Sequence, residues 1–164
     1  MKSPKRYYKV IRKETRTSAT ATPSIQLTYP KGQWVEPILP HSKIFVFSNL
    51  DDACHFAEEY PSFSYAVNSK KKLIVNNPST LIVVPCFVKN PRMVHSALPV
   101  IGDDERKNYL LLKKYWTKLH ELGHPESIGW WDQRVWGKYT SKKGIHVIDP
   151  PYGTMLCDAV MCLK

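Results

Sequence analysis

His120 and His124 frame a His-Glu-x-x-His motif, the pattern with which zinc hydrolases hold a catalytic metal ion. In such enzymes both histidines lie on one face of a helix and bind the zinc ion, and the glutamate acts on the metal-bound water. By this pattern His120 and His124 would be the metal ligands and Glu121 the catalytic general base. A zinc hydrolase, with zinc as its cofactor, is therefore one hypothesis for this sequence.

The residues that follow the motif argue against this hypothesis. Pro125 directly follows His124, and the residue before a proline is disfavoured in the α conformation. Gly123 is typical of the position just past the end of a helix. We therefore expect the helix to end near Leu122, so that His124 leaves the face on which His120 lies. The third-ligand position of the metzincin pattern holds Trp130, which leaves as conceivable third ligands Asp132, His146, Asp149 and Asp158. The sequence favours a protein without a metal cofactor.

A second group of side chains combines aromatic rings with positive charge in one short segment. It consists of Trp130, Trp131, Arg134, Trp136, Lys138, Tyr139, Lys142 and Lys143. Indole rings stack on nucleic-acid bases and lysines hold phosphates, but tryptophans at this spacing also bind protein neighbours or fill a core. Arg6, Lys9 and Arg12 add positive charge near the N-terminus. If the two segments are adjacent, we expect a basic, aromatic-rich binding surface, with a protein as the favoured partner and nucleic acid as the alternative.

Composition limits the class of protein further. The 24 lysines and arginines exceed the 14 acidic residues and give a net charge of +10, which attracts acidic proteins, nucleic acids or anionic membrane surfaces. The four cysteines form no Cys-x-x-Cys pair and lie in apolar runs, where reduced cysteine acts as a small core residue. No apolar run matches a signal peptide or a membrane span. We expect an intracellular protein, cytoplasmic or in a virion, that is neither secreted nor inserted into a membrane.

The elements that would position these residues form one α+β domain over residues 1–164, with a mostly antiparallel sheet. Alternating or β-branched segments predict strands at 6–12, 43–47, 79–89, 145–149 and 154–163, with further short strands around Pro30 and in 63–75. Pro85 predicts an edge or a bulge in its strand. A short helix is expected at about 49–59, capped by Ser48 or Asn49 and ended by Pro61. A long helix is expected at about 103–122.

Several stretches carry a resemblance, among them "YYKVIRK", "KGQWVEP", "KIFVFSNLDDACHFA" and "YGTMLCDAVMCL". Over about half of its length the chain resembles a loosely defined group of small uncharacterised proteins from phages and large DNA viruses. The resemblance implies a viral setting and brings no catalytic residues with it. Together with the binding surface, it leads us to expect a non-enzymatic accessory or structural protein of a virus, associated with the virion, with capsid or other viral proteins as partners. Segment 43–57 also resembles ADP-ribosyltransferase-like folds, which implies a role for Arg12 and a late catalytic glutamate. The last glutamate in the chain is Glu126, so the last expected strands contain no glutamate for this role.

Overall fold

The computed structural model describes residues 3–19, 25–64, 81–93, 98–100, 105–122, 146–148 and 152–164. Its strands are β1 (Tyr7–Arg12), β2 (Trp34–Val35), β3 (Ile44–Phe47), β4 (Leu81–Lys89), β5 (Arg92–Met93), β6 (Leu98–Val100), β7 (His146–Ile148), β8 (Thr154–Cys157) and β9 (Ala159–Cys162). Its helices are α1 (Leu50–Ser64) and α2 (Glu105–Leu122). The named strands pair antiparallel throughout, so the predicted α+β class is confirmed. Neither described helix is long and apolar enough to cross a membrane.

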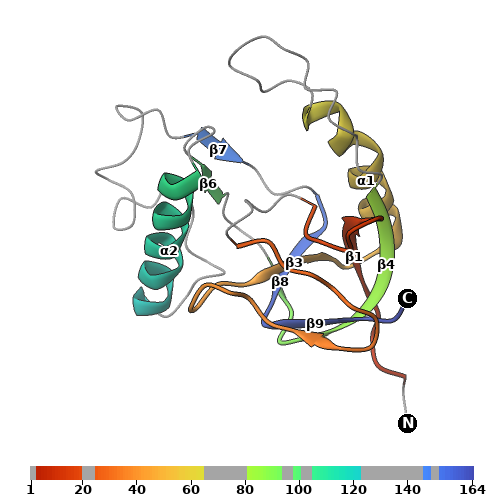
Figure 1. The fold of residues 1–164 in the computed structure, drawn as a ribbon. Coiled ribbons are helices and arrows are strands. Elements are labelled where there is room, and N and C mark those ends of the chain that lie inside the picture. The colour runs from red at the N-terminus through yellow and green to blue at the C-terminus, as the bar shows by residue number, and fades with distance from the viewer. Residues whose placement is uncertain are drawn as a thin grey trace.

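Seven strands form one strongly curved sheet in the order β2-β9-β4-β1-β3-β8-β5, and β6 pairs separately with β7. Only Asp158 separates β8 from β9, yet β8 pairs with β3 and β5 while β9 pairs with β2 and β4. The chain can pass from one side of β4-β1-β3 to the other within one residue only if these strands curl into a barrel-like ring (Figure 1).

The bend at Asp158 corrects the prediction of one continuous strand over 154–163. The backbone N–H of Asp158 donates to the carbonyl of Lys89 at 2.8 Å, although Lys89 already faces Ala159 in the register of β4 and β9. Two residues of this strand thus oppose one residue of β4, which is the arrangement of a β-bulge. Bulges bend a strand and increase its twist, and this one lets a single stretch of chain serve both sides of the ring.

The interior of the barrel holds the main hydrophobic core. Its buried members are Tyr7, Ile11, Tyr29, Ile44, Val46, Val84, Cys86, Cys157, Val160 and Cys162. Successive side chains of a strand point to opposite faces, so Tyr8 and Val10 of β1 lie outside the barrel. There they pack with Phe47 and Ala53 in a second cluster under α1. Both faces of β1 are therefore buried.

Helix α1 covers the outer face of β1 and the first half of β4, where Phe56 and Ala57 pack on the second cluster. Asn49, one of the two residues predicted to cap this helix, does so: its Oδ1 accepts the N–H of Asp52 at 2.9 Å. The predicted end at Pro61 is wrong, because the helix continues to Ser64. A proline removes one helical hydrogen bond and favours a kink, which a helix supported by packing on its preceding turns tolerates.

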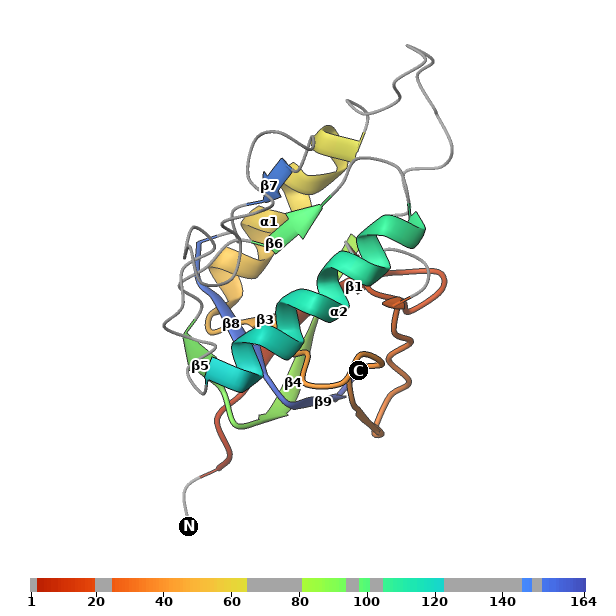
Figure 2. The same cartoon turned by 90° about the vertical axis from the view of Figure 1, so that its left-hand side faces the viewer.

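Helix α2 lies on the opposite side of the sheet from α1 and packs against β6 (Figures 1 and 2). It ends at Leu122, where the sequence predicts its end. Leu112, Tyr115 and Trp116 of its predicted apolar face are buried, together with Leu111. The ring of Trp116 meets that of Tyr115 edge-on, with centroids 5.2 Å apart.

Pro85 lies in an interior strand of the sheet, and β4 pairs with β1 residue for residue on both sides of it, so the prediction of an edge or a bulge at Pro85 is wrong. Its carbonyl accepts the N–H of Leu163 at 2.9 Å, and Leu163 lies one residue beyond the end of β9. The nitrogen and carbonyl of one residue in an antiparallel strand point toward the same neighbour. The nitrogen of Pro85, which has no hydrogen to donate, therefore points toward Leu163 at the end of the β9 ladder. The hydrogen bonds between β4 and β1 are unaffected.

Candidate functional site

The basic residues near the N-terminus do not share one surface. Arg6 is exposed and Arg12 is half-buried, with Nη2 donating to the carbonyl of Ala19 at 3.2 Å. Lys9 is only 9% exposed, because it lies on the same face of β1 as Tyr7 and Ile11, and this face points into the barrel. Its ammonium donates to the carbonyl of Phe45 at 2.7 Å, the kind of partner that a buried charge requires. Lys9 therefore leaves the predicted binding surface.

The aromatic and basic segment itself lies outside the described residues, and so does His124. Its members are Trp130, Trp131, Arg134, Trp136, Lys138, Tyr139, Lys142 and Lys143. Their role in binding remains a prediction.

The first half of the His-Glu-x-x-His motif lies in the last turn of α2. His120 is exposed and stacks on His41 of the loop before β3, with ring centroids 3.7 Å apart and planes 13° from parallel. The lone pairs of two parallel rings run side by side and do not converge on one point, whereas the ligands of a tetrahedral zinc ion converge. In this arrangement His41 and His120 cannot bind the same ion, and the stack joins α2 to the loop.

Over the part of the chain that the structure describes, no group of three or more histidine, cysteine, aspartate or glutamate side chains could hold a metal ion. Asp158, one of the conceivable third zinc ligands, accepts hydrogen bonds from Lys43 and Asn90 instead.

Three of the four cysteines lie in the barrel interior, as their apolar surroundings in the sequence indicate. Cys86 and Cys157 are fully buried, and Cys162 is 1% exposed. Burial raises the pKa of all three thiols, that of Cys157 to about 12. The neighbouring Cys162 raises the pKa of Cys86 further. The thiolate is the nucleophilic form of cysteine, so these groups are poor nucleophiles at neutral pH.

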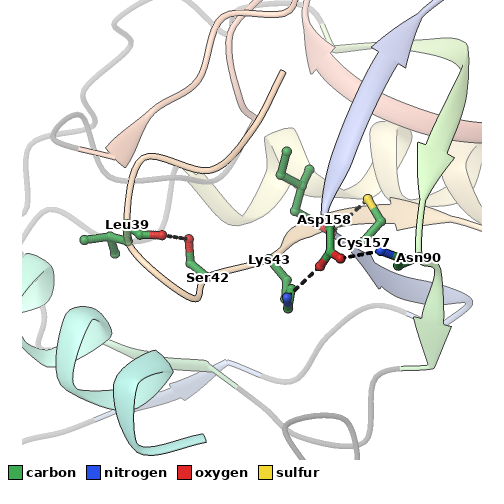
Figure 3. A network of polar contacts seen from close by, with 7 residues as sticks. Leu39, Ser42, Lys43, Asn90, Cys157 and Asp158 are labelled. Carbon is green, nitrogen blue, oxygen red and sulfur yellow. Dashed lines mark hydrogen bonds and ion pairs between the residues drawn. The ribbon is translucent and has the colours of Figure 1, made fainter. Parts of the chain in front are cut away.

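The bend between β8 and β9 carries a polar junction (Figure 3). Lys43, just before β3, forms an ion pair of 2.6 Å with Oδ1 of Asp158, and Asn90, just after β4, donates to Oδ2 at 2.7 Å. Partial burial alone would raise the pKa of Asp158, but the hydrogen bonds from Lys43 and Asn90 outweigh it and lower the pKa. The carboxylate thus ties together three segments that are far apart in the chain. Its arrangement indicates a structural role.

A different surface lies on the outside of β2, β9 and β4. Cys86, Val88, Val160, Cys162 and Val35 all pack with the interior core. The residues that alternate with them therefore point outward.

The outward side chains on these three strands are aromatic and apolar. Trp34 lies directly opposite Met161, which lies directly opposite Phe87, so the three side chains form one row. Trp34 is 43% exposed, and Met161 and Phe87 are partly exposed. The ammonium of Lys89 lies over the ring of Trp34, 4.4 Å from its centroid, at the distance of a cation–π contact. We call these four residues the β9 face.

Helix α1 does not extend over the β9 face. The cluster under α1 includes Leu81 and Val83 from the first half of β4, but neither Phe87 nor Lys89. In Figure 1, β9 runs along the lower end of the barrel, with α1 above it on one side and α2 on the other. The sequence alone does not reveal this face, because its residues come from three separate segments and only the sheet order brings them together.

Comparisons with known proteins find no family model, no curated protein and no solved structure that matches the chain.

Proposed function

We propose that this protein is a non-enzymatic binding protein whose β9 face contacts a protein partner. The main support for this proposal is the partly exposed row of Trp34, Met161 and Phe87. The cores of protein interfaces are enriched in tryptophan, phenylalanine and methionine and depleted of most charges. Tryptophan is also one of the residues enriched at the energetic centre of interfaces.

The charge of the chain favours an acidic partner. Two copies of a protein with a net charge of +10 repel each other, whereas an acidic protein is attracted. Lys89 places one positive charge at the apolar row itself. Complementary charge mainly accelerates the encounter and excludes wrong partners, while the apolar side chains supply the affinity.

The chemistry of the described residues supports binding over catalysis. The three interior thiols are held in the protonated form, and His120 is stacked on His41. The helix with the motif ends two residues before His124. Together with the resemblance to phage and viral proteins, these features lead us to propose an accessory or structural protein of a virus, in the cytoplasm or in the virion, with a capsid or other viral protein as partner.

A titration with an acidic polypeptide tests the proposed surface. The probe is a fluorescently labelled random copolymer of glutamate and tyrosine, which offers negative charge and aromatic rings together. We expect it to bind, and we expect Trp34→Ala to weaken binding about tenfold or more, as at the centre of an interface. Tyr152→Ala is the matched control, because Tyr152 is an aromatic residue with 88% exposure that lies next to β8. Equal effects of the two substitutions would contradict the assignment of the β9 face.

Nucleic acid is the second candidate, and the contact between Lys89 and Trp34 favours it. An exposed indole stacks on bases, and a lysine beside it holds phosphate. A labelled single-stranded DNA of mixed sequence separates the two candidates. Nucleic-acid binding falls steeply with salt concentration, whereas an interface held by apolar contacts depends on salt less.

A further inference from the structure

Cys86 and Cys162 face each other directly inside the barrel. They are partners in the register of β4 and β9, and both side chains belong to the interior core. Cys157 belongs to the same cluster but is paired differently: it lies opposite Ile44 on β3, and its Sγ donates to the carbonyl of Ile44 at 3.5 Å. Only one pair of the three interior thiols is therefore opposed across a strand ladder.

The hydrogen bonds around this pair define its type. The N–H of Leu163 donates to the carbonyl of Pro85. Pro85 and Leu163, the pair next to Cys86 and Cys162 in the ladder, are therefore a hydrogen-bonded pair. The carbonyl of Cys162 points away from β4 and accepts the N–H of Gly32 at 2.8 Å. Cys86 and Cys162 consequently occupy a non-hydrogen-bonded site of the antiparallel ladder.

Such a site has the dimensions of a disulfide bond. In non-hydrogen-bonded pairs the Cα atoms lie about 4.5 Å apart and the side chains approach closely. Disulfides span Cα separations of about 4.4–6.8 Å. A bond between the two sulfur atoms thus requires little movement of β4 or β9.

We propose that Cys86 and Cys162 form a reversible disulfide that fastens β9 to β4 when the protein meets an oxidising thiol–disulfide couple. With glutathione disulfide as the oxidant, one protein thiolate attacks a sulfur atom of glutathione disulfide and releases one glutathione. The second protein thiolate then attacks the mixed disulfide and releases the other glutathione. Two protein thiols are oxidised, one glutathione disulfide is reduced, and the two protons pass to the released thiolates.

The surroundings of the pair make its two thiols slow to react. Burial raises the pKa of both thiols, so the thiolate is rare at neutral pH and oxidation accelerates as the pH rises. The product would hold β9, which carries Met161, against β4, which carries Phe87 and Lys89. The disulfide would thereby fix the β9 face, although its formation does not depend on the proposed function.

Peptide mapping of the wild-type protein tests the proposal without a mutation. The protein is equilibrated with reduced and oxidised glutathione at mildly alkaline pH, with urea at the foot of the unfolding transition so that the interior opens. It is then quenched, alkylated and digested for mass spectrometry. We expect a cross-linked peptide pair containing Cys86 and Cys162, with Cys54 and Cys157 alkylated. Free thiols throughout, glutathione adducts alone, or a predominant disulfide to Cys157 would overturn the proposal.

Stability measurements show whether the disulfide belongs to the native fold. The urea midpoint of the wild type should rise on oxidation, because a cross-link compatible with the native geometry restricts the unfolded chain. Cys157→Ala should retain this rise, whereas Cys162→Ala should abolish it. A midpoint that falls on oxidation would show that the bond distorts β4 and β9, and would contradict the proposal.

Discussion

Replacing Asp158 by asparagine removes the charge of the polar junction and preserves the shape of the side chain. The side chains of Lys43 and Asp158 are 21% and 33% exposed, so their ion pair lies between a surface pair, worth about 0.2–1 kcal/mol, and a buried one, whose disruption costs about 3–5 kcal/mol. Because an asparagine oxygen still accepts one hydrogen bond, we expect Asp158→Asn to lower the free energy of unfolding by about 1–2 kcal/mol. In a protein of this size the melting temperature should fall by roughly 3–6 °C.

Urea unfolding followed by circular dichroism measures this loss, and its pH dependence identifies the cause. The pKa of Asp158 is lowered in the folded protein, so its stabilisation is complete above the unfolded pKa of about 4 and disappears as the pH falls through the folded value. The wild type and Asp158→Asn should therefore differ at neutral pH and converge in acid.

Two further comparisons make this prediction specific. In the Lys43→Met background, Asp158→Asn should lower the free energy of unfolding by less than it does in the wild type, because the two charges act on each other. Glu14→Gln removes an exposed carboxylate elsewhere and should change stability by less than about 0.5 kcal/mol. A loss that persists unchanged in acid, or additive effects of the two substitutions, would refute the role of the ion pair.

Two other predictions concern the turn before β8 and the aromatic segment. Gly153 has a φ of +82°, and a Cβ there would lie 2.7 Å from Cγ and 2.9 Å from Cβ of Asp52, so Gly153→Ala should lower the free energy of unfolding by about 1–3 kcal/mol. Urea unfolding measures this, and an unchanged midpoint would show that Asp52 moves freely. Changing Lys138, Lys142 and Lys143 together to glutamate should weaken single-stranded DNA binding and reduce the slope against log salt concentration by about 2, since each phosphate contact contributes about 0.7. An unchanged slope in a filter-binding series would remove these lysines from any nucleic-acid surface.

Local patterns predict the elements whose causes lie within a short stretch of chain. Asn49 caps α1 through a hydrogen bond three residues away, and α2 ends before Gly123 as its sequence indicates. The runs of β-branched and aromatic residues in β1, β3 and β4 were also predicted within two residues at each end. In each case the determining contacts are near in sequence.

The remaining features depend on contacts between distant segments. Lys9 turns inward because both faces of β1 are covered, which no alternation within 6–12 reveals. The break at Asp158 requires the carbonyl of Lys89 as an acceptor, and the β9 face requires the order of β2, β9 and β4. A single sequence contains no signal for these pairings, because each depends on how the barrel closes.

Hydrogen–deuterium exchange with and without the glutamate–tyrosine copolymer locates the bound surface without a mutation. We expect the copolymer to slow exchange in peptides that cover residues 31–36, 85–89 and 159–163, and to leave exchange in 152–157 unchanged. Protection that falls elsewhere and spares these three segments would contradict the assignment of the binding surface to the β9 face.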